Sequence, residues 1–257
     1  MDSDSDNDVF GIIPDSPRAE ACRIGTEAGF EFKRYHRKIS IAEDSSGGEF
    51  LFPYKADDIT GCGGKTWEAA TILSNYMAYR WSLDKNFLKG LNVVEVGAGT
   101  GVVGILAGMM MAEAEQDQEQ KTGKVWVTDM LFLDLMQKNV DLNMNESERQ
   151  CVKVAELKWG TPILPDIVAK PVNLILAADC VYLEAAFDPL LQTLVELSTL
   201  ETTEIWIVSK KRRKADKRFF DKLKKKFNVV EIKDDPDYEV FSREGLTILN
   251  ARIKGPK

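Results

Sequence analysis

The chain has 257 residues, 44% of them hydrophobic, so it is long enough to bury one substantial core. Its formal net charge is -7, but residues 210–226 hold eleven Lys and Arg against two Asp, which leaves -16 for the rest of the chain. A mostly acidic surface argues against general nucleic-acid binding and is compatible with a basic protein or peptide partner.

The cysteines and the apolar runs exclude further classes of protein. Cys22, Cys62, Cys151 and Cys180 form no C-x-x-C pair, so we expect neither a metal site nor a disulfide framework. The chain does not begin with a basic-then-apolar leader, and its longest apolar run, Val102–Ala112, is shorter than the ~20 residues of a spanning helix. We therefore expect a soluble cytoplasmic protein that does not contact membranes.

The first part of the chain is interpreted as an extension of the main domain. Met1–Asp8 alternates Asp with Ser or Asn, and we predict a disordered acidic tail over residues 1–20. Phe30–Ile41 and Glu49–Tyr54 carry aromatic and β-branched residues around a polar break, which predicts a β-hairpin-like extension over residues 21–57.

The main domain is expected to span residues 58–257, where strand-like and helix-like apolar patterns alternate as in parallel βαβ units. The run Val172–Ala177 is apolar throughout, which is typical of a strand covered on both faces. We predict a Rossmann-like α/β fold with a seven-strand, mostly parallel sheet and an antiparallel last strand. The predicted helices are 66–81, 102–111, 131–142, 187–197 and 215–227, and the predicted strands are 93–96, 125–128, 151–157, 172–177, 204–208, 228–232 and 247–253.

A glycine turn organises this domain. Gly97, Gly99 and Gly101 have the spacing G-x-G-x-G between a β-branched run and an apolar helix, without the third glycine of the dinucleotide fingerprint G-x-G-x-x-G. Such a turn lets a ligand lie against bare backbone at the carboxyl end of a parallel strand. Glu95 adds a carboxylate there, which suits a cationic ligand such as S-adenosylmethionine better than a pyrophosphate.

Residues at two further strand ends fit the same kind of ligand. Asp129 ends the second predicted strand, where a carboxylate can accept hydrogen bonds from two ribose hydroxyls. It could equally be an N-cap for the helix from Leu131, and both roles can hold at once. Trp159, after the third strand, offers a flat apolar face to an adenine, or else is an ordinary half-buried tryptophan.

Asp179 and Tyr182 close the fourth predicted strand, across the crevice from the glycine turn, where transferred groups are handled in such folds. Their spacing of three lets a tight turn aim both at one pocket, although an N-cap and a packed tyrosine would look the same. Trp67 follows the glycine loop Gly61–Gly64, and its ring either lies near a sulfonium or packs into the core.

Taken together, these motifs resemble the seven-strand protein-lysine methyltransferases of methyltransferase family 16, over residues 58–253. The glycine turn with its acid, the Trp-Gly pair and above all Asp179-Cys180-Val181-Tyr182 carry the resemblance. It implies an S-adenosylmethionine-dependent protein-lysine N-methyltransferase that releases S-adenosylhomocysteine and needs no metal, with Asp179 and Tyr182 as catalytic residues. The implied cofactor-binding residues are Trp67, Glu95, Gly97, Gly99, Gly101, Asp129, Met130, Trp159 and Ala178.

Two stretches, Leu176–Glu184 and Ser209–Phe220, resemble family members that methylate translation elongation factor 1-alpha. They imply that protein as the substrate of a monomeric enzyme, with no nucleic-acid substrate. The basic run Lys210–Lys214 also has the pattern of a nuclear-localisation or RNA-binding patch, which would give a nuclear pool. Helical spacing of the aromatic residues behind it predicts instead that much of the charge is a solvated helix face.

Three other functions compete with this interpretation. A methyltransferase of the same fold with a nucleic-acid or small-molecule acceptor stays open, although an Asn-Pro-Pro-Tyr-like motif, typical of base methylation, is missing from the fourth strand. A non-catalytic cofactor-binding module also stays open. A nicotinamide-dependent oxidoreductase is disfavoured because the sequence lacks a Tyr-x-x-x-Lys pair, and the single histidine, His36, lies in the extension, which disfavours a serine hydrolase.

Overall fold

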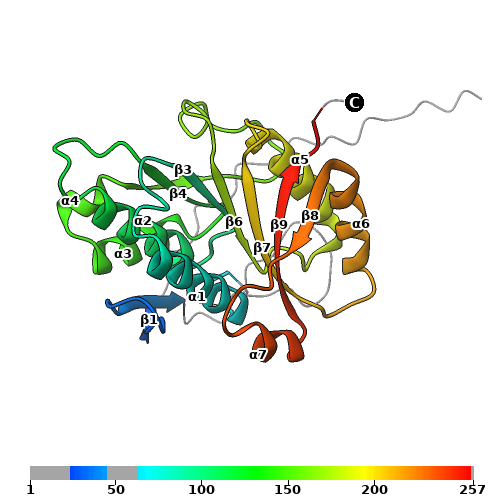
Figure 1. The fold of residues 1–257 in the computed structure, drawn as a ribbon, viewed down its shortest axis with the longest axis horizontal. Helices are drawn as coiled ribbons and strands as arrows, with labels where there is room; N and C mark the ends of the chain where they lie inside the picture. The colour runs from blue at the N-terminus through cyan, green and yellow to red at the C-terminus, as the bar shows by residue number, and fades with distance from the viewer. Residues whose placement is uncertain (1–23, 45–62, 256–257) are drawn as a thin grey trace, which may run out of the picture.

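The computed structural model describes residues 24–44 and 63–255, and a seven-stranded sheet forms its centre (Figure 1). The strand order is β5-β4-β3-β6-β7-β9-β8, and only the pairings made by β9 are antiparallel. The predicted mostly parallel α/β fold with an antiparallel last strand is therefore confirmed. The strands are β3 (Asn92–Val96), β4 (Lys124–Asp129), β5 (Val152–Glu156), β6 (Leu174–Ala178), β7 (Glu204–Lys210), β8 (Phe227–Glu231) and β9 (Leu246–Ile253).

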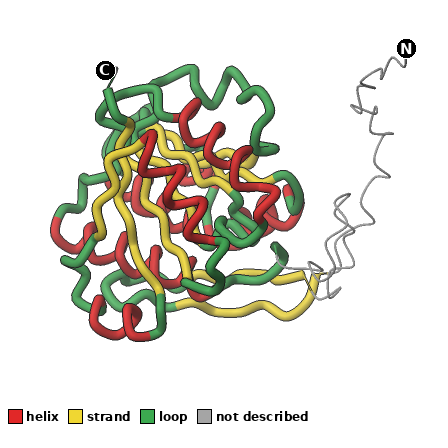
Figure 2. Tube along the Cα trace, turned by 90° about the vertical axis from the view of Figure 1, so that its right-hand side faces the viewer, coloured by secondary structure: helices red, strands yellow, loops and turns green. Residues whose placement is uncertain are grey.

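Helices cover both faces of the sheet (Figure 2). Side chains alternate along each strand, so that Val93 of β3 belongs to one hydrophobic cluster and Val94 to the other. One face packs against α1 (Glu68–Leu83), α2 (Val102–Ala114), α3 (Leu133–Asn143) and α7 (Tyr238–Arg243), and the other against α5 (Phe187–Leu197) and α6 (Asp216–Lys226). Two shorter pieces are α4 (Glu146–Arg149) and the 3-10 helix η1 (Glu184–Ala186).

None of these helices, within the described ranges, has the length and apolar character needed to cross a membrane. The element boundaries lie within a few residues of those predicted, and α5 matches its predicted range.

The N-terminal extension is a hairpin, but its strands are not the predicted ones. Strand β1 (Ile24–Phe30) pairs antiparallel with β2 (Ile39–Asp44), so the predicted strand Phe30–Ile41 is wrong: most of it is the connection between β1 and β2. Tyr35 N donates to Phe32 O across a turn (3.0 Å), and both rings are buried. Their burial against the core, rather than a strand, explains the aromatic pattern. Glu49–Tyr54 and the tail 1–20 lie outside the described residues.

Two asparagines on α3 attach the hairpin to the main domain. The Asn139 side chain accepts from Ala42 N (2.8 Å) and donates to Ala42 O (3.0 Å), and Asn143 does the same with Ser40 (2.8 and 2.7 Å). Four residues of helix rise about 6 Å and two residues of strand about 6.6 Å, so the amides match alternate residues of β2. Asn139 also donates to Thr100 O (2.9 Å), which ties the hairpin to the glycine turn.

Candidate active site

A cavity of about 370 Å³ opens at the carboxyl ends of β3, β4 and β6. It also receives residues from the start of α1 and from the connection between β7 and α6. Of the site residues predicted from the sequence, all except Gly101 line this one cavity. They are Trp67, Glu95, Gly97, Gly99, Asp129, Met130, Trp159, Ala178, Asp179 and Tyr182.

The glycine turn brings bare backbone to the cavity wall. Gly97 and Gly99 have φ of 62° and 57°, a region that side chains other than glycine rarely adopt. A Cβ on Gly97 would lie 2.8 Å from Trp159 Cζ2, and a Cβ on Gly99 would lie 2.6 Å from the carbonyl oxygen of Gly63. The turn is therefore enclosed by the Trp159 ring on one side and by the loop before α1 on the other.

Gly101 has a different place. It is the N-cap of α2 with φ 80°, and a Cβ there would lie 3.0 Å from Val127 Cγ1, beneath the cavity rather than on its wall. In this structure, Gly101 starts the helix and allows close packing, and only its two neighbours in the motif face the cavity.

Two buried carboxyl groups line the cavity beside the turn. Glu95 accepts from Gly104 N (2.8 Å), and desolvation raises its pKa to about 8 although that hydrogen bond opposes the shift. Asp129 accepts from Gly99 N (2.9 Å) and Leu131 N (3.0 Å), and desolvation again raises its pKa. Helix α3 begins later, at Leu133, so Asp129 joins β4 to the glycine turn rather than capping that helix.

Asp179 follows β6 in a left-handed conformation with φ 59°. Among the described residues, only Asp179 and Phe132 (φ 61°) are non-glycine residues with positive φ, and both line the cavity. Such backbone costs on the order of 1–2 kcal/mol for an ordinary side chain and concentrates at functional sites. The conformation turns the end of β6 into the cavity, and Tyr182 lines the same cavity three residues later.

Arg212, which the sequence interpretation missed as a site residue, covers the Asp179 carboxylate. Its Nη1 and Nη2 donate to the two carboxylate oxygens at 2.5 and 2.7 Å, and the Asp179 side chain is only 10% exposed. The signal for this pair is not local in the sequence: Arg212 follows β7, and the order of strands in the sheet places β7 beside β6, which Asp179 follows.

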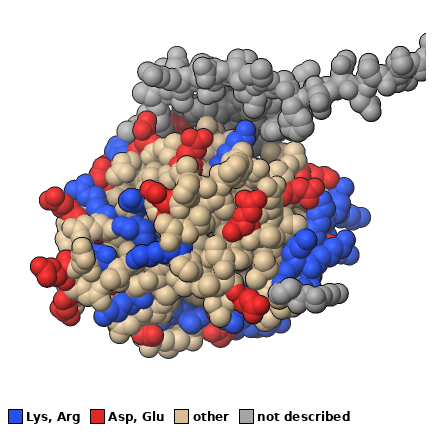
Figure 3. Space-filling view, turned by 90° about the horizontal axis from the view of Figure 1, so that it is seen from above, with Lys and Arg blue, Asp and Glu red and all other residues tan. Residues whose placement is uncertain are grey.

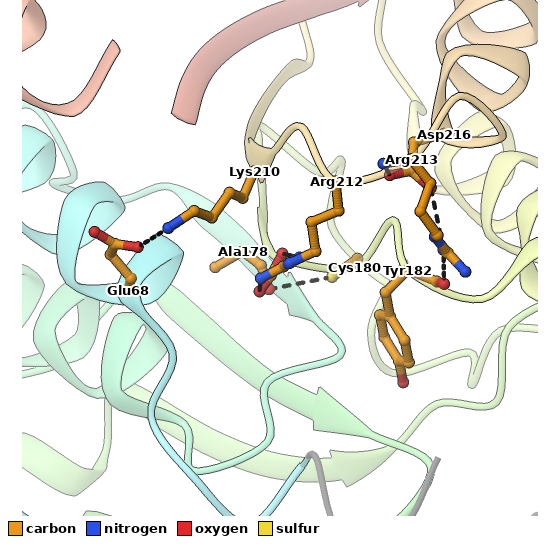
Figure 4. A network of polar contacts seen from close by, with 9 residues as sticks. Glu68, Ala178, Cys180, Tyr182, Lys210, Arg212, Arg213 and Asp216 are labelled. Atoms are coloured by element: carbon orange, nitrogen blue, oxygen red, sulfur yellow. Dashed lines mark hydrogen bonds and ion pairs between the residues drawn. The ribbon is translucent and has the colours of Figure 1, made fainter. Parts of the chain in front are cut away.

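The basic run is therefore not a helix face, and that interpretation is wrong for Lys210–Lys214. Lys210 ends β7 and bonds Glu68 of α1 (2.8 Å), and Arg213 bonds the backbone carbonyl of Tyr182 and Asp216, the first residue of α6 (Figure 4). Figure 4 also shows the Tyr182 ring extending away from Arg213. The exposed Lys and Arg side chains of α6, such as Lys217, Arg218 and the lysines of 224–226, lie at the side where positive charge gathers on the right of Figure 3.

Trp67 is at the mouth of the cavity. It is 44% exposed and immediately precedes α1, so of its two predicted roles the packed core position is excluded. The preceding Thr66 hydroxyl hydrogen-bonds the Thr100 hydroxyl (3.0 Å), which holds the start of α1 against the glycine turn. Phe132, Thr66 and Thr100 also line the cavity and were not identified from the sequence, because their positions depend on tertiary contacts.

The residues present fit S-adenosylmethionine. The wall combines glycine backbone with no space for a Cβ, a tryptophan ring against Gly97, and two carboxyl groups suited to an ammonium and to ribose hydroxyls. In this arrangement the cofactor would be held by the predicted residues that line the cavity, which are Trp67, Glu95, Gly97, Gly99, Asp129, Met130, Trp159 and Ala178. Asp179 and Tyr182 would face the acceptor.

Comparison with known proteins gives a consistent result. The model of a family described as lysine methyltransferase matches residues 52–226. The chain is 38% identical to protein-lysine N-methyltransferase EFM6 of Saccharomyces cerevisiae over 201 residues, 72% of this chain and 78% of that protein. It is 34% identical to protein N-lysine methyltransferase METTL21A of Danio rerio over 182 residues, 70% of this chain and 75% of that protein.

Proposed function

Because the chain belongs to the lysine methyltransferase family and is an S-adenosylmethionine-dependent protein-lysine N-methyltransferase, we propose that its substrate is a lysine of translation elongation factor 1-alpha. One observation supports this most. The stretches Leu176–Glu184 and Ser209–Phe220, which resemble methyltransferases of that factor, meet at the cavity mouth through the ion pair of Asp179 and Arg212. We further propose that the enzyme acts as a cytoplasmic monomer.

The reaction sets the requirements for the acceptor side. When bound, S-adenosylmethionine supplies a sulfonium methyl group, which passes to the lysine ε-nitrogen lone pair while the carbon–sulfur electrons stay on sulfur, leaving S-adenosylhomocysteine. The lysine must be neutral to attack, yet its ordinary pKa is about 10.4. In the proposed mechanism Asp179 accepts a hydrogen bond from the amine and orients it, Tyr182 forms the channel wall, and water takes the proton. Proximity and orientation then supply most of the acceleration.

The test is methyl transfer in a defined extract. S-adenosylmethionine with a tritiated methyl group is incubated with the purified enzyme and a lysate of cells that lack this enzyme. A second reaction replaces the lysate with purified elongation factor 1-alpha. We expect one labelled protein of that size, no label with Asp179→Ala, and normal label with Asp221→Ala, which removes an acid from α6, away from the cavity. Label on another protein would contradict the proposed substrate, and label retained by Asp179→Ala would contradict its role.

A further inference from the structure

The pairing of Asp179 with Arg212 poses a chemical problem that rests on the proposed function of Asp179. An isolated carboxylate beside a lysine stabilises the ammonium form, which cannot accept a methyl group. In the structure, however, both carboxylate oxygens bind the Arg212 guanidinium in a bidentate pair, which is among the strongest geometries for such a contact. A guanidinium stays charged at every relevant pH.

The pair leaves room for a substrate amine. Each carboxylate oxygen has a second lone-pair direction, so Asp179 can accept from an amine while it binds Arg212. Arg212 is 37% exposed and lines the cavity, so its charge lies where the acceptor must enter. The net charge that a lysine meets at the end of β6 is then close to zero.

We propose that Arg212 is a positioning residue that neutralises Asp179, so that the site binds the uncharged ε-amine of the substrate lysine rather than its ammonium form. Asp179 orients the amine through a hydrogen bond, and the Asp179–Arg212 pair carries no net negative charge. The same guanidinium holds the carboxylate in place on a left-handed residue, so orientation and charge balance come from one contact.

The other charged groups around this position strengthen the need for Arg212. Glu95 on β3 and Asp129 on β4 line the same cavity, and although burial raises the pKa of both, each adds negative charge once the cations of a bound cofactor favour its ionised form. Three cations line it within the described part of the chain, and of these Arg212 is the partner of Asp179. The remaining titratable or charged groups nearby are Cys180, whose pKa burial raises, Tyr182, Lys65, Lys158, the Glu68–Lys210 pair with Glu244 beside it, and Arg213 with Asp216.

The first experiment measures kcat for elongation factor 1-alpha at saturating S-adenosylmethionine, from pH 6.5 to 10, in the wild type, Arg212→Gln and Arg212→Lys, because the pH dependence of kcat reports groups in the enzyme–substrate complex. The lysine must lose a proton, so activity rises with pH to a plateau. Without the guanidinium, the midpoint of this rise should move up by about one to two pH units, so that activity falls about 10- to 100-fold at pH 7.5 and largely returns at high pH. In Arg212→Lys the midpoint should lie close to its wild-type pH, because the positive charge is kept.

The control is Lys214→Gln, which removes an exposed positive charge from the same connection. It should leave the midpoint within a few tenths of a pH unit. A uniform loss of activity in Arg212→Gln with an unchanged midpoint would assign Arg212 a structural role only and overturn the proposal. A lower KM with an unchanged midpoint would make Arg212 a competitor of the substrate, and would overturn it as well.

A second measurement does not depend on the identity of the protein substrate. An S-adenosylmethionine analogue in which a carbon bearing a primary amine replaces the sulfonium sulfur and its methyl group presents an amine to the acceptor side. Calorimetry compares its affinity with that of S-adenosylhomocysteine at pH 7. The affinity for the analogue divided by the affinity for S-adenosylhomocysteine should be about tenfold higher in Arg212→Gln than in the wild type. The reason is that the carboxylate of Asp179, no longer neutralised, now binds the ammonium form. An unchanged ratio would overturn the inference even where elongation factor 1-alpha proves not to be the substrate.

Discussion

The Oε2 atom of Glu95 lies 2.8 Å from the backbone nitrogen of Gly104, in the first turn of α2, and accepts its hydrogen bond. The contact links the first strand of the cofactor-binding unit to the helix that follows it. A Cβ on Gly104 would lie 2.5 Å from this oxygen, so the approach depends on glycine. Glu95 is 3% exposed, and the cost of charging it there has consequences for stability and for binding.

The first consequence is a pH-dependent stability. Burial raises the pKa of Glu95 to about 8, against 4.5 in an unfolded chain, so the folded state holds the proton more tightly. The protonated group makes its full contribution to the free energy of unfolding below about pH 4.5, and this contribution is lost as the pH rises through 8. Glu95→Gln keeps an acceptor for Gly104 without a charge to bury. Urea unfolding should find it more stable than the wild type by about 1–3 kcal/mol at pH 8.5, with little difference at pH 5. A constant difference across this range would contradict the prediction.

The second consequence concerns the cofactor, whose ammonium and sulfonium would favour the ionised form of Glu95. Binding at pH 7 should therefore release up to about one proton, and affinity should rise with pH between about 6 and 8. Calorimetric titrations in two buffers of different ionisation enthalpy measure the release. Glu95→Gln should abolish most of it, and an equal release in both proteins would assign the proton to another group.

Gly97→Ala should weaken cofactor binding at least tenfold. The new Cβ would occupy a left-handed position and lie 2.8 Å from the Trp159 ring, which must then move off the glycine turn. Gly245 provides a matched control, because it has φ 80° but a Cβ added there would meet no atom within 4 Å. Gly245→Ala should cost about 1–2 kcal/mol of stability and leave the cofactor dissociation constant unchanged. Equal losses of affinity in both variants would refute the role of the Trp159 contact.

Asn139→Ala should destabilise the protein by about 2–4 kcal/mol, because it leaves the buried amide and carbonyl of Ala42 and the carbonyl of Thr100 without this partner. Because Thr100 belongs to the glycine turn, cofactor affinity should fall as well. Gln137→Ala, on the exposed side of α3, should stay within about 0.5 kcal/mol. Chemical denaturation and calorimetry measure both effects, and a loss of stability without any loss of affinity would separate the hairpin from the cofactor site.

The sheet and its helices could be predicted because their residues carry the pattern locally. A β-branched run such as Val93–Val96 that breaks into glycines specifies strand, turn and helix within a dozen residues. The same holds for most of the candidate site, since parallel strands place their carboxyl ends at one edge. Asp129 and Asp179 could thus be assigned to one crevice from topology alone.

What could not be predicted depends on contacts between distant residues. Phe32 and Tyr35 suggested a strand because they are aromatic. They lie instead at a turn, and their side chains are buried in the core. Tyr35 packs edge-on against Trp81 there, with ring centroids 5.2 Å apart. Arg212 looked like one more charge in a basic run, and its role is visible only when β7 lies beside β6. In the first case the local pattern predicted the wrong element, and in the second it did not identify the partner.

The asparagine ladder between β2 and α3 has a consequence for biosynthesis. Ribosomes make β2 first, but Ala42 obtains its side-chain partner only after a further 97 residues, when Asn139 has been made. Until then the backbone groups of Ser40 and Ala42 form an open strand edge, which can pair with other chains. The interval between the synthesis of the hairpin and that of α3 is therefore a period in which the nascent chain needs protection from intermolecular pairing.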